Sequence, residues 1–265
     1  MIELIHGDCL DVMQKMKSNY VDLTVTSPPY DNLRDYNDYT FDFENIAKEL
    51  FRITKEGGVV VWIVGDATIK GTETGTSFKQ ALYFMDCGFR LHDTMIYQKD
   101  SISFPEKNRY YPIFEYMFVF SKNKPKTTNL IQDRKNLCAN GRKHIKGRYR
   151  KSDGVLTRHD KQNLLKEYGV RYNIWRIPTG CGKSSKDKIA YEHPAIMPEK
   201  LAADHIISWS NENDLIFDPF LGSGTTAKMS YLYNRNFIGC EISEEYYLIA
   251  KKRIEKHQSQ LKLFI

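Results

Sequence analysis

The sequence of 265 residues lacks any apolar run long enough to cross a membrane. Its longest apolar stretch, residues 58–64, is far shorter than the roughly 20 residues that a spanning helix needs. The amino-terminal residues contain neither a basic segment nor a long apolar one, so no secretory signal is visible and a cytoplasmic protein is expected. The five cysteines form no CxxC pair, which predicts free thiols rather than a disulfide framework, and predicts no metal site.

The charge is unevenly distributed along the chain. The net charge is +6, yet residues 121–188 hold 19 Lys and Arg against 5 Asp and Glu, and the remainder holds 20 against 28. Within that basic stretch, residues 141–151 alternate cations with glycine and tyrosine, a composition that suits the spaced phosphates of a nucleic acid. On charge alone, a solvated surface loop explains the stretch equally well.

Apolar periodicity predicts alternating strands and helices on both sides of the basic stretch, and the composition is that of an ordinary globular protein. The run at residues 58–64 is almost continuously apolar, which is typical of a strand buried on both faces. We therefore expect an α/β doubly wound sheet. Strands are expected at residues 2–6, 21–26, 58–64, 89–98, 115–121, 215–218 and 237–241, and helices at 9–17, 41–54, 77–87, 198–210, 225–232 and 243–256.

A glycine-rich turn follows the strand expected at residues 215–218 and opens the next helix. Its sequence, Asp-Pro-Phe-Leu-Gly-Ser-Gly-Thr-Thr from Asp218, places Gly222 and Gly224 where a backbone must approach a ligand closely. Glu241 ends the following strand, and in Rossmann-like sheets an acid there hydrogen-bonds ribose hydroxyls. Turn and acid together favour a nucleoside site over a structural connection.

A second motif, Thr-Ser-Pro-Pro-Tyr at residues 26–30, also ends a strand. Its two prolines fix φ and exclude both helix and ladder pairing, so the turn is rigid and Tyr30 can present an exposed ring. A proline turn with a core tyrosine is the alternative.

The two motifs, in this order, resemble those of the amino-group DNA methyltransferases that use S-adenosylmethionine, in the permuted arrangement called the beta class. The resemblance covers residues 1–120 and 190–258. It implies a Rossmann-like methyltransferase fold with permuted motif order and an inserted basic target recognition region. The implied domains are a catalytic half at residues 1–121, the target recognition region at 122–188 and a donor-binding half at 189–265.

The resemblance implies that the catalytic motif is Ser27, Pro28, Pro29 and Tyr30. The Ser27 side chain and the Pro28 carbonyl would accept hydrogen bonds from the amino group of the target base. That base would be flipped out of the duplex and stacked on Tyr30, and no covalent intermediate is required.

The resemblance also implies a donor site and a DNA-binding site. Asp8 would contact the donor's adenine amino group, and His193 with Pro194 would help to hold its methionine part. The remaining donor-binding candidates belong to the glycine-rich turn and its acidic partner: Asp218, Phe220, Gly222, Ser223, Gly224, Thr225 and Glu241. The DNA-binding candidates are the cations of the basic stretch: Arg142, Lys143, Lys146, Arg148, Arg150 and Lys151.

Several alternatives stay open from the sequence. The expected function is DNA methylation, and cytosine N4 is slightly favoured over adenine N6 because serine opens the catalytic motif. The alternatives are methylation of RNA or of a protein amide, and a DNA-binding module without catalytic activity. Asp66 either lines the site or caps the next turn. Double-stranded DNA is the expected partner, and a cognate restriction endonuclease is a further candidate. Residues Gln260 to Phe264 resemble a sliding-clamp peptide or form an ordinary tail, and monomer and homodimer remain equal choices.

Overall fold

The computed structural model describes residues 1–29, 41–101, 107–136, 148–158 and 166–261. It divides into two compact units: Met1–Asn129 together with Asn173–Ile265, and Leu130–Tyr172. The second unit lies inside the expected target recognition region, residues 122–188. The segments that flank it, 122–129 and 173–188, belong to the first unit.

The first unit is built on an eight-stranded mixed sheet with strand order β1-β14-β13-β2-β3-β7-β6-β12. Neighbouring strands are parallel, except that β7 runs antiparallel to both β3 and β6. The doubly wound α/β sheet expected from the sequence is confirmed. The strands are β1 (Ile2–His6), β2 (Val21–Thr26), β3 (Thr54–Val64), β6 (Arg90–Gln98), β7 (Phe114–Ser121), β12 (Ile174–Arg176), β13 (Leu215–Asp218) and β14 (Asn236–Glu241).

The edge strand β12 lies in a stretch for which the sequence predicted no regular structure. Trp175 is buried there, and the strand pairs with β6 so that Ile174 is opposite Ile96. No strand was expected from the sequence between residues 122 and 188, and this is wrong at β12 and at the short strands of the second unit. Three residues are too few to show a periodicity, and only pairing with β6 makes them a strand.

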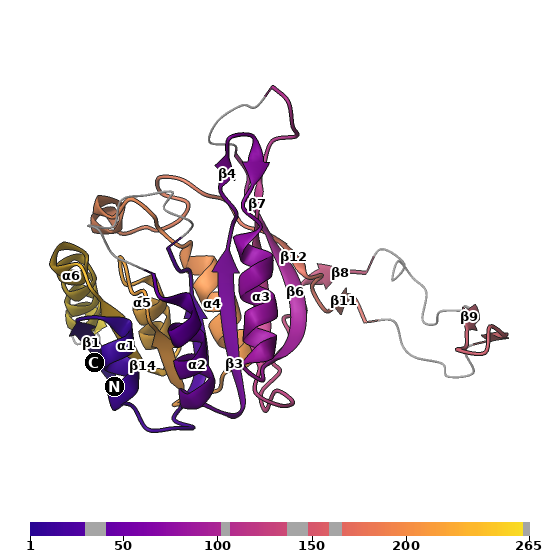
Figure 1. Cartoon of the computed structure of the whole chain (residues 1–265), viewed down its shortest axis with the longest axis horizontal. Coiled ribbons are helices and arrows are strands. Elements are labelled where there is room, and N and C mark those ends of the chain that lie inside the picture. Colours follow the sequence, from indigo (N-terminus) through magenta and orange to yellow (C-terminus); the bar gives the residue numbers. More distant parts are fainter. Residues whose placement is uncertain (30–40, 102–106, 137–147, 159–165, 262–265) are drawn as a thin grey trace. The chain divides into compact units, whose positions relative to one another are not determined.

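Helices cover both faces of the sheet (Figure 1). One hydrophobic cluster joins the sheet to helices α1, α2 and α3, and a second cluster joins the opposite face to α4, α5 and α6. The helices are α1 (Cys9–Lys15), α2 (Phe43–Ile53), α3 (Thr76–Asp86), α4 (Glu199–Trp209), α5 (Thr225–Leu232) and α6 (Glu244–Leu261), with a short 3-10 helix, η2, at Lys188–Glu192.

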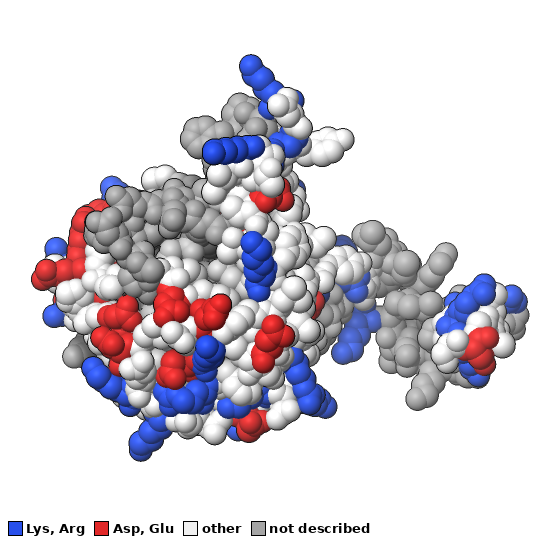
Figure 2. Space-filling model, viewed as in Figure 1, with Lys and Arg blue, Asp and Glu red and all other residues white. Residues whose placement is uncertain are grey.

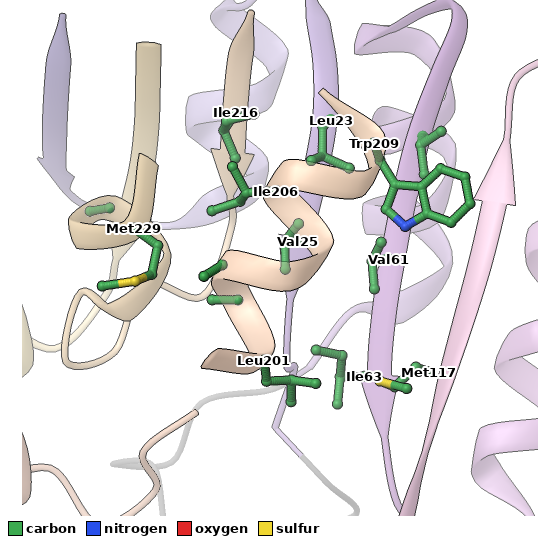
Figure 3. Packing of buried hydrophobic residues seen from close by; sticks show 14 of the residues in the cluster. Leu23, Val25, Val61, Ile63, Met117, Leu201, Ile206, Trp209, Ile216 and Met229 are labelled. Atoms are coloured by element: carbon green, nitrogen blue, oxygen red, sulfur yellow. The ribbon is translucent and has the colours of Figure 1, made fainter. Parts of the chain in front are cut away.

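The two faces of β3 explain its continuous apolar sequence. Successive side chains of a strand point to opposite faces, so Val61 and Ile63 enter the cluster under α4, whereas Trp62 enters the cluster under α2 and α3. Figure 3 shows Val61 and Ile63 beside Leu201 and Trp209 of α4. Because both faces of residues 59–64 are buried, apolar side chains occupy both faces.

The parallel strands bring the sequence motifs to one edge of the sheet. Strands β1, β2, β13 and β14 are parallel neighbours and end at His6, Thr26, Asp218 and Glu241. The residues that follow them carry the two motifs. In open α/β sheets, ligands bind outside these carboxyl ends.

The second unit contains two short antiparallel strand pairs. Strand β8 (Arg134–Lys135) pairs with β11 (Tyr168–Gly169), and β9 (Arg148–Arg150) pairs with β10 (Leu156–Arg158). The Arg134 guanidinium lies 4.7 Å from the centre of the Tyr172 ring. The small hairpin of β4 (Thr68–Ile69) and β5 (Thr72–Glu73) belongs to the first unit.

Candidate active site

A cavity of about 630 Å³ opens at the carboxyl edge of the sheet. Its volume is in the range of small-molecule and cofactor sites. The cavity brings together residues from both sequence motifs and from their expected partners: Asp8, Ser27, Pro28, Pro29, His193, Pro194, Asp218, Phe220, Gly222, Ser223, Thr225 and Glu241. Gly224 is not among its lining residues, and Tyr30 lies outside the described part of the chain.

A buried hydrogen bond connects the two motifs. The Thr26 hydroxyl donates to Asp218 Oδ1 over 2.6 Å, and the backbone N–H of Phe220 donates to the same oxygen over 3.1 Å. Burial raises the pKa of Asp218 to about 6, against the effect of these hydrogen bonds, because a carboxylate loses its hydration there. Asp218 is therefore fixed directly beside the start of the catalytic motif.

Gly222 lies in a turn that is hydrogen-bonded to Glu241 and that passes close to the His193 ring. Its φ of +50° is in the left-handed region, and its N–H donates to Glu241 Oε2 over 2.8 Å. A Cβ atom at this position would lie 3.2 Å from His193 Nε2. The second oxygen of Glu241 accepts from the Ser243 N–H over 3.0 Å, and burial raises the pKa of this carboxyl. The absence of a side chain at residue 222 keeps the turn close to both groups.

Gly224 meets a different requirement. Its φ is +78°, and a Cβ atom there would lie 3.0 Å from the Cβ of Ala250 in α6. The glycine allows close packing of the turn against α6. From the sequence, Gly224 was predicted to let the backbone approach a ligand; in the structure it packs against Ala250 and is not a lining residue of the cavity.

Asp8 and His193 are held by local hydrogen bonds. Asp8 caps α1, because its Oδ1 accepts from the Leu10 N–H over 2.7 Å. Nδ1 of His193 accepts from the Ala195 N–H over 3.0 Å, and its ring centre lies 4.3 Å from that of Tyr246. Both residues therefore have fixed positions at the cavity wall.

The catalytic motif leaves the sheet directly after β2. Pro28 is buried, and Ser27 and Pro29 are half-buried at the cavity wall. The structure thus places the three described residues of the motif in the same cavity as Asp218 and Glu241.

The sequence did not identify three residues that line the cavity: Tyr97 in β6, Lys99 just after β6 and Glu115 in β7. The Lys99 ammonium lies 2.5 Å from Glu115 Oε1, and Tyr97 is buried beside them. Burial raises the pKa of the Tyr97 phenol, and its hydroxyl has no hydrogen-bond partner among the described residues. The sequence predicted strands at 89–98 and 115–121, but only their antiparallel pairing places these residues at the cavity.

Asp66 caps a helix and does not line the cavity. Its Oδ1 accepts from the Ser77 N–H over 2.8 Å, and its Oδ2 accepts from the Ser77 hydroxyl over 2.6 Å, at the start of α3. The sequence left open whether Asp66 lines the site or caps the next turn, and these hydrogen bonds favour the second interpretation.

The three DNA-binding candidates that the structure describes are exposed. Arg148, Arg150 and Lys151 lie at the β9–β10 hairpin of the second unit. In Figure 2, blue Lys and Arg side chains lie on the surface of the part of the second unit that carries this hairpin. The other three DNA-binding candidates, Arg142, Lys143 and Lys146, lie outside the described residues, as does most of the clamp-like peptide.

Among the described helices, none has the length and apolar character of a membrane span. No group of three or more His, Cys, Asp or Glu among the described residues is arranged to hold a metal ion.

Comparison with known sequences gives a family match over most of the chain. The model of a DNA methylase family, N6_N4_Mtase, matches residues 21–252. The orphan methyltransferase M.BamHII of Bacillus amyloliquefaciens is 70% identical over 237 residues, which cover 89% of each chain. Identity at this level extends well beyond the short motifs.

Solved structures show the same fold at lower sequence identity. PvuII DNA methyltransferase (cytosine-N4-specific) matches with a TM-score of 0.68 and 20% identity, over 94% of this chain and 84% of that one. The structure of an M1.HpyAVI–SAM complex matches with a TM-score of 0.63 and 22% identity, over 96% of this chain and 100% of that one.

Proposed function

This chain belongs to the DNA methylase family whose model matches residues 21–252, and we propose that its cavity transfers a methyl group from S-adenosylmethionine to the exocyclic amino group of a flipped DNA base. The observation that carries this proposal is the buried Thr26–Asp218 hydrogen bond, because it fixes the catalytic motif beside the glycine-rich turn. Two reactants held at one place need little further ordering before they react.

The cavity suits S-adenosylmethionine chemically. The Glu241 carboxylate uses one oxygen for Gly222 and the other for Ser243, and its remaining lone pairs can accept hydrogen bonds from ribose hydroxyls. Asp8 offers carboxylate oxygens to an amino group, and His193 with Pro194 lines the cavity near Gly222. S-adenosylmethionine supplies an electrophilic methyl group on a sulfonium.

We assign orientation of the target amino group to Ser27 and Pro28. The amino nitrogen of cytosine or adenine is a poor nucleophile because its lone pair is delocalised into the ring. Acceptors at the Ser27 hydroxyl and the Pro28 carbonyl would hold the amino hydrogens and localise that lone pair. Tyr30 would stack on the flipped base.

We favour cytosine N4 over adenine N6 as the target. Serine opens the catalytic motif, and at this position the motif resembles that of the cytosine enzymes more than that of the adenine enzymes. PvuII methyltransferase, described as cytosine-N4-specific, shares the fold at a sequence identity that supports no transfer of base preference.

The second unit is proposed to contact the target DNA. Residues 130–172 hold 12 Lys and Arg against 4 Asp and Glu, and the described cations of the β9–β10 hairpin are exposed. Phosphate contacts by such cations position a protein on duplex DNA. Since its substrate is DNA, the enzyme is proposed to act in the cytoplasm of a bacterial or phage-infected cell. The 70% identical relative is called an orphan methyltransferase, which favours a solitary enzyme over one paired with a restriction endonuclease.

The proposal is tested by product analysis. The protein is incubated with S-adenosylmethionine and mixed-sequence duplex DNA, and the DNA is digested to nucleosides for mass spectrometry. We expect N4-methylcytosine; N6-methyladenine would reverse the base and keep the assigned residues. If donor binding is intact and neither product forms, the proposal fails, and RNA and protein amides are tested next in a competition for labelled methyl groups.

A further inference from the structure

A buried group of charged side chains lies behind the glycine-rich turn. The Arg253 side chain in α6 is fully buried, and Lys228 in α5 is nearly so. They share two carboxylates: Asp187, which precedes η2, and Glu199, which begins α4. Helices α4, α5 and α6 and the residue before η2 therefore meet at one ionic cluster.

All three nitrogens of the Arg253 guanidinium donate hydrogen bonds in this cluster. Nη1 donates to the Ser223 carbonyl over 2.9 Å and to the Thr225 hydroxyl over 3.1 Å. Nε donates to Asp187 Oδ2 over 2.8 Å, and Nη2 donates to Glu199 Oε1 over 2.6 Å. Nη2 also donates to the Ser185 hydroxyl over 3.1 Å. A planar fork is required to meet all of these acceptors.

These contacts join two walls of the cavity. Ser223 and Thr225 belong to the glycine-rich turn and line the cavity on one side. Gly180 and Ser184 line it from the segment that leads to Ser185 and Asp187. Arg253 itself is not a lining residue, so it acts on the cavity only through these residues.

We propose that Arg253 is a positioning residue that holds the glycine-rich turn and the segment 180–187 in the arrangement that binds the methyl donor. This inference rests on the proposed function, because it assigns a role in the donor site. It predicts that loss of the guanidinium weakens donor binding while the chemistry at saturating donor is retained.

Lys228 provides an internal comparison for this role. Its ammonium lies 2.8 Å from the same Asp187 oxygen and 2.8 Å from the same Glu199 oxygen that bind Arg253. Lys228 has no described hydrogen bond to Ser223 or Thr225. Burial raises the pKa of Asp187, but hydrogen bonds from Lys228, Arg253 and His257 outweigh it and hold that pKa well below its ordinary value. The two cations thus share the ionic role, and Arg253 alone of the two reaches the turn.

Without Arg253, the glycine-rich turn loses the N–H groups that hydrogen-bond to the Ser223 carbonyl and the Thr225 hydroxyl. A turn that samples several conformations must be ordered when the donor binds, and this ordering reduces the apparent affinity. We expect Arg253→Lys to raise the donor Kd by about tenfold, which corresponds to about 1.4 kcal/mol. The kcat at saturating donor should stay near the parental value.

The experiment compares Arg253→Lys with Lys228→Met in the full-length protein. Donor Kd is measured by titration calorimetry with S-adenosylmethionine, and backbone amide exchange of residues 223–225 is measured without donor. Arg253→Lys should raise both the Kd and the exchange rate. Lys228→Met should lower the melting temperature and leave both readouts near the parental values. Equal increases in Kd for the two variants would overturn the inference, as would a parental Kd for folded Arg253→Lys.

A third variant covers a failure of Arg253→Lys to fold. Thr225→Val removes one acceptor from the turn and retains every ion pair of Arg253. It should raise the donor Kd several-fold, and a parental Kd and parental amide exchange in this variant would overturn the inference. Absence of donor binding by the parental protein would instead contradict the proposed donor site itself.

Discussion

Thr26 and Asp218 are 192 positions apart in the sequence and are joined by a buried hydrogen bond of 2.6 Å. Each is the last residue of its strand, and the two strands, β2 and β13, are parallel neighbours. Strand pairing therefore determines how far the catalytic motif lies from the glycine-rich turn. A permuted order of motifs along the chain leaves this relationship intact, because it depends on which strands are neighbours.

Thr26→Val is expected to destabilise the protein by about 1–3 kcal/mol, because it leaves a buried carboxyl with one fewer donor. Thr24 provides a matched control on the same strand. Its side chain is equally buried, and its hydroxyl has no hydrogen-bond partner among the described residues. Thr24→Val should therefore be neutral or stabilising. Urea unfolding of the two variants measures the difference.

The methyltransferase rate of the same variants gives a second readout. Thr26 precedes Ser27, so loss of its hydrogen bond should also lower turnover, whereas Thr24→Val should retain it. If Thr26→Val and Thr24→Val have equal unfolding free energies, the hydrogen bond does not contribute as the geometry indicates.

The raised pKa of Asp218 predicts a specific pH dependence of stability. Below about pH 4 the carboxyl is protonated in both the folded and the unfolded chain. As the pH rises toward 6, the unfolded chain releases its proton and the folded chain retains it, because the folded pKa is about 6. The contribution of Asp218 to stability therefore falls across this window, by up to about 3 kcal/mol. The nearby Glu241 carboxyl contributes to the same shift.

Asp218→Asn isolates this effect, because asparagine keeps an acceptor for Thr26 and Phe220 and does not ionise. We expect the unfolding free energy of the parent minus that of the variant to fall between pH 4 and pH 6. The pKa of Asp187 is lowered, so its contribution to stability changes with pH in the opposite direction. That contribution is the same in parent and variant and cancels in the difference of unfolding free energies. A difference that is constant over this pH range would contradict the assignment.

Gly222→Ala should weaken donor binding by more than tenfold. Its Cβ would lie 3.2 Å from His193 Nε2, and alanine at φ +50° adds backbone strain of about 1 kcal/mol. Gly71→Ala is the control, because Gly71 also has a positive φ, of +80°, but would meet no atom within 4 Å and does not line the cavity. Titration of both variants with S-adenosylmethionine separates the effect of backbone strain at a positive φ from the effect of a methyl group added next to His193. Similar donor affinities in the two would show that the approach of Gly222 to His193 has no role.

A larger, charged side chain at residue 222 provides a second test of the donor site. Gly222→Asp places a carboxylate close to Glu241 and should abolish donor binding, since like charges at a buried site are unfavourable. Retained binding in this variant would remove the glycine-rich turn from the donor site.

The sequence predicted the sheet well because the strongest signals are local. The unbroken apolar run of β3 follows from burial on both faces, and each motif ends a strand, so parallel pairing places the motifs at one edge. The three-residue strand β12 was missed because its pairing with β6 is its only signal. Gly224 has the same sequence signal as Gly222, and only the contact with Ala250 distinguishes its role.

The cavity was predicted less completely than the fold. Tyr97, Lys99 and Glu115 reach it through antiparallel pairing of β6 and β7, whose register does not follow from apolar periodicity. Arg253 lies in a helix rich in charged residues, and nothing in its spacing separates a buried arginine from its exposed neighbours. Long-range contacts of single polar residues are therefore the part that the sequence does not reveal.

Tyr30→Ala tests whether catalysis and donor binding reside in separate parts of the cavity. The proposed role of Tyr30 is to stack on the flipped base, which is worth about 1–3 kcal/mol per base in proteins that bind single strands. Turnover should therefore fall by about tenfold to a hundredfold at subsaturating DNA. Donor affinity should stay at the parental value, because Asp8, Gly222 and Glu241 are unchanged.

Ser27→Ala provides the comparison within the same motif. It removes a hydrogen-bond acceptor from the amino group and should lower kcat at saturating DNA, since the acceptor acts on the reacting nitrogen. Tyr30→Ala should mainly raise the KM for DNA. Steady-state kinetics with varied DNA, together with donor titration of both variants, distinguishes the two effects. Equal loss of donor binding and turnover in Tyr30→Ala would contradict separate roles, because a stacking residue has no reason to change the affinity for the donor.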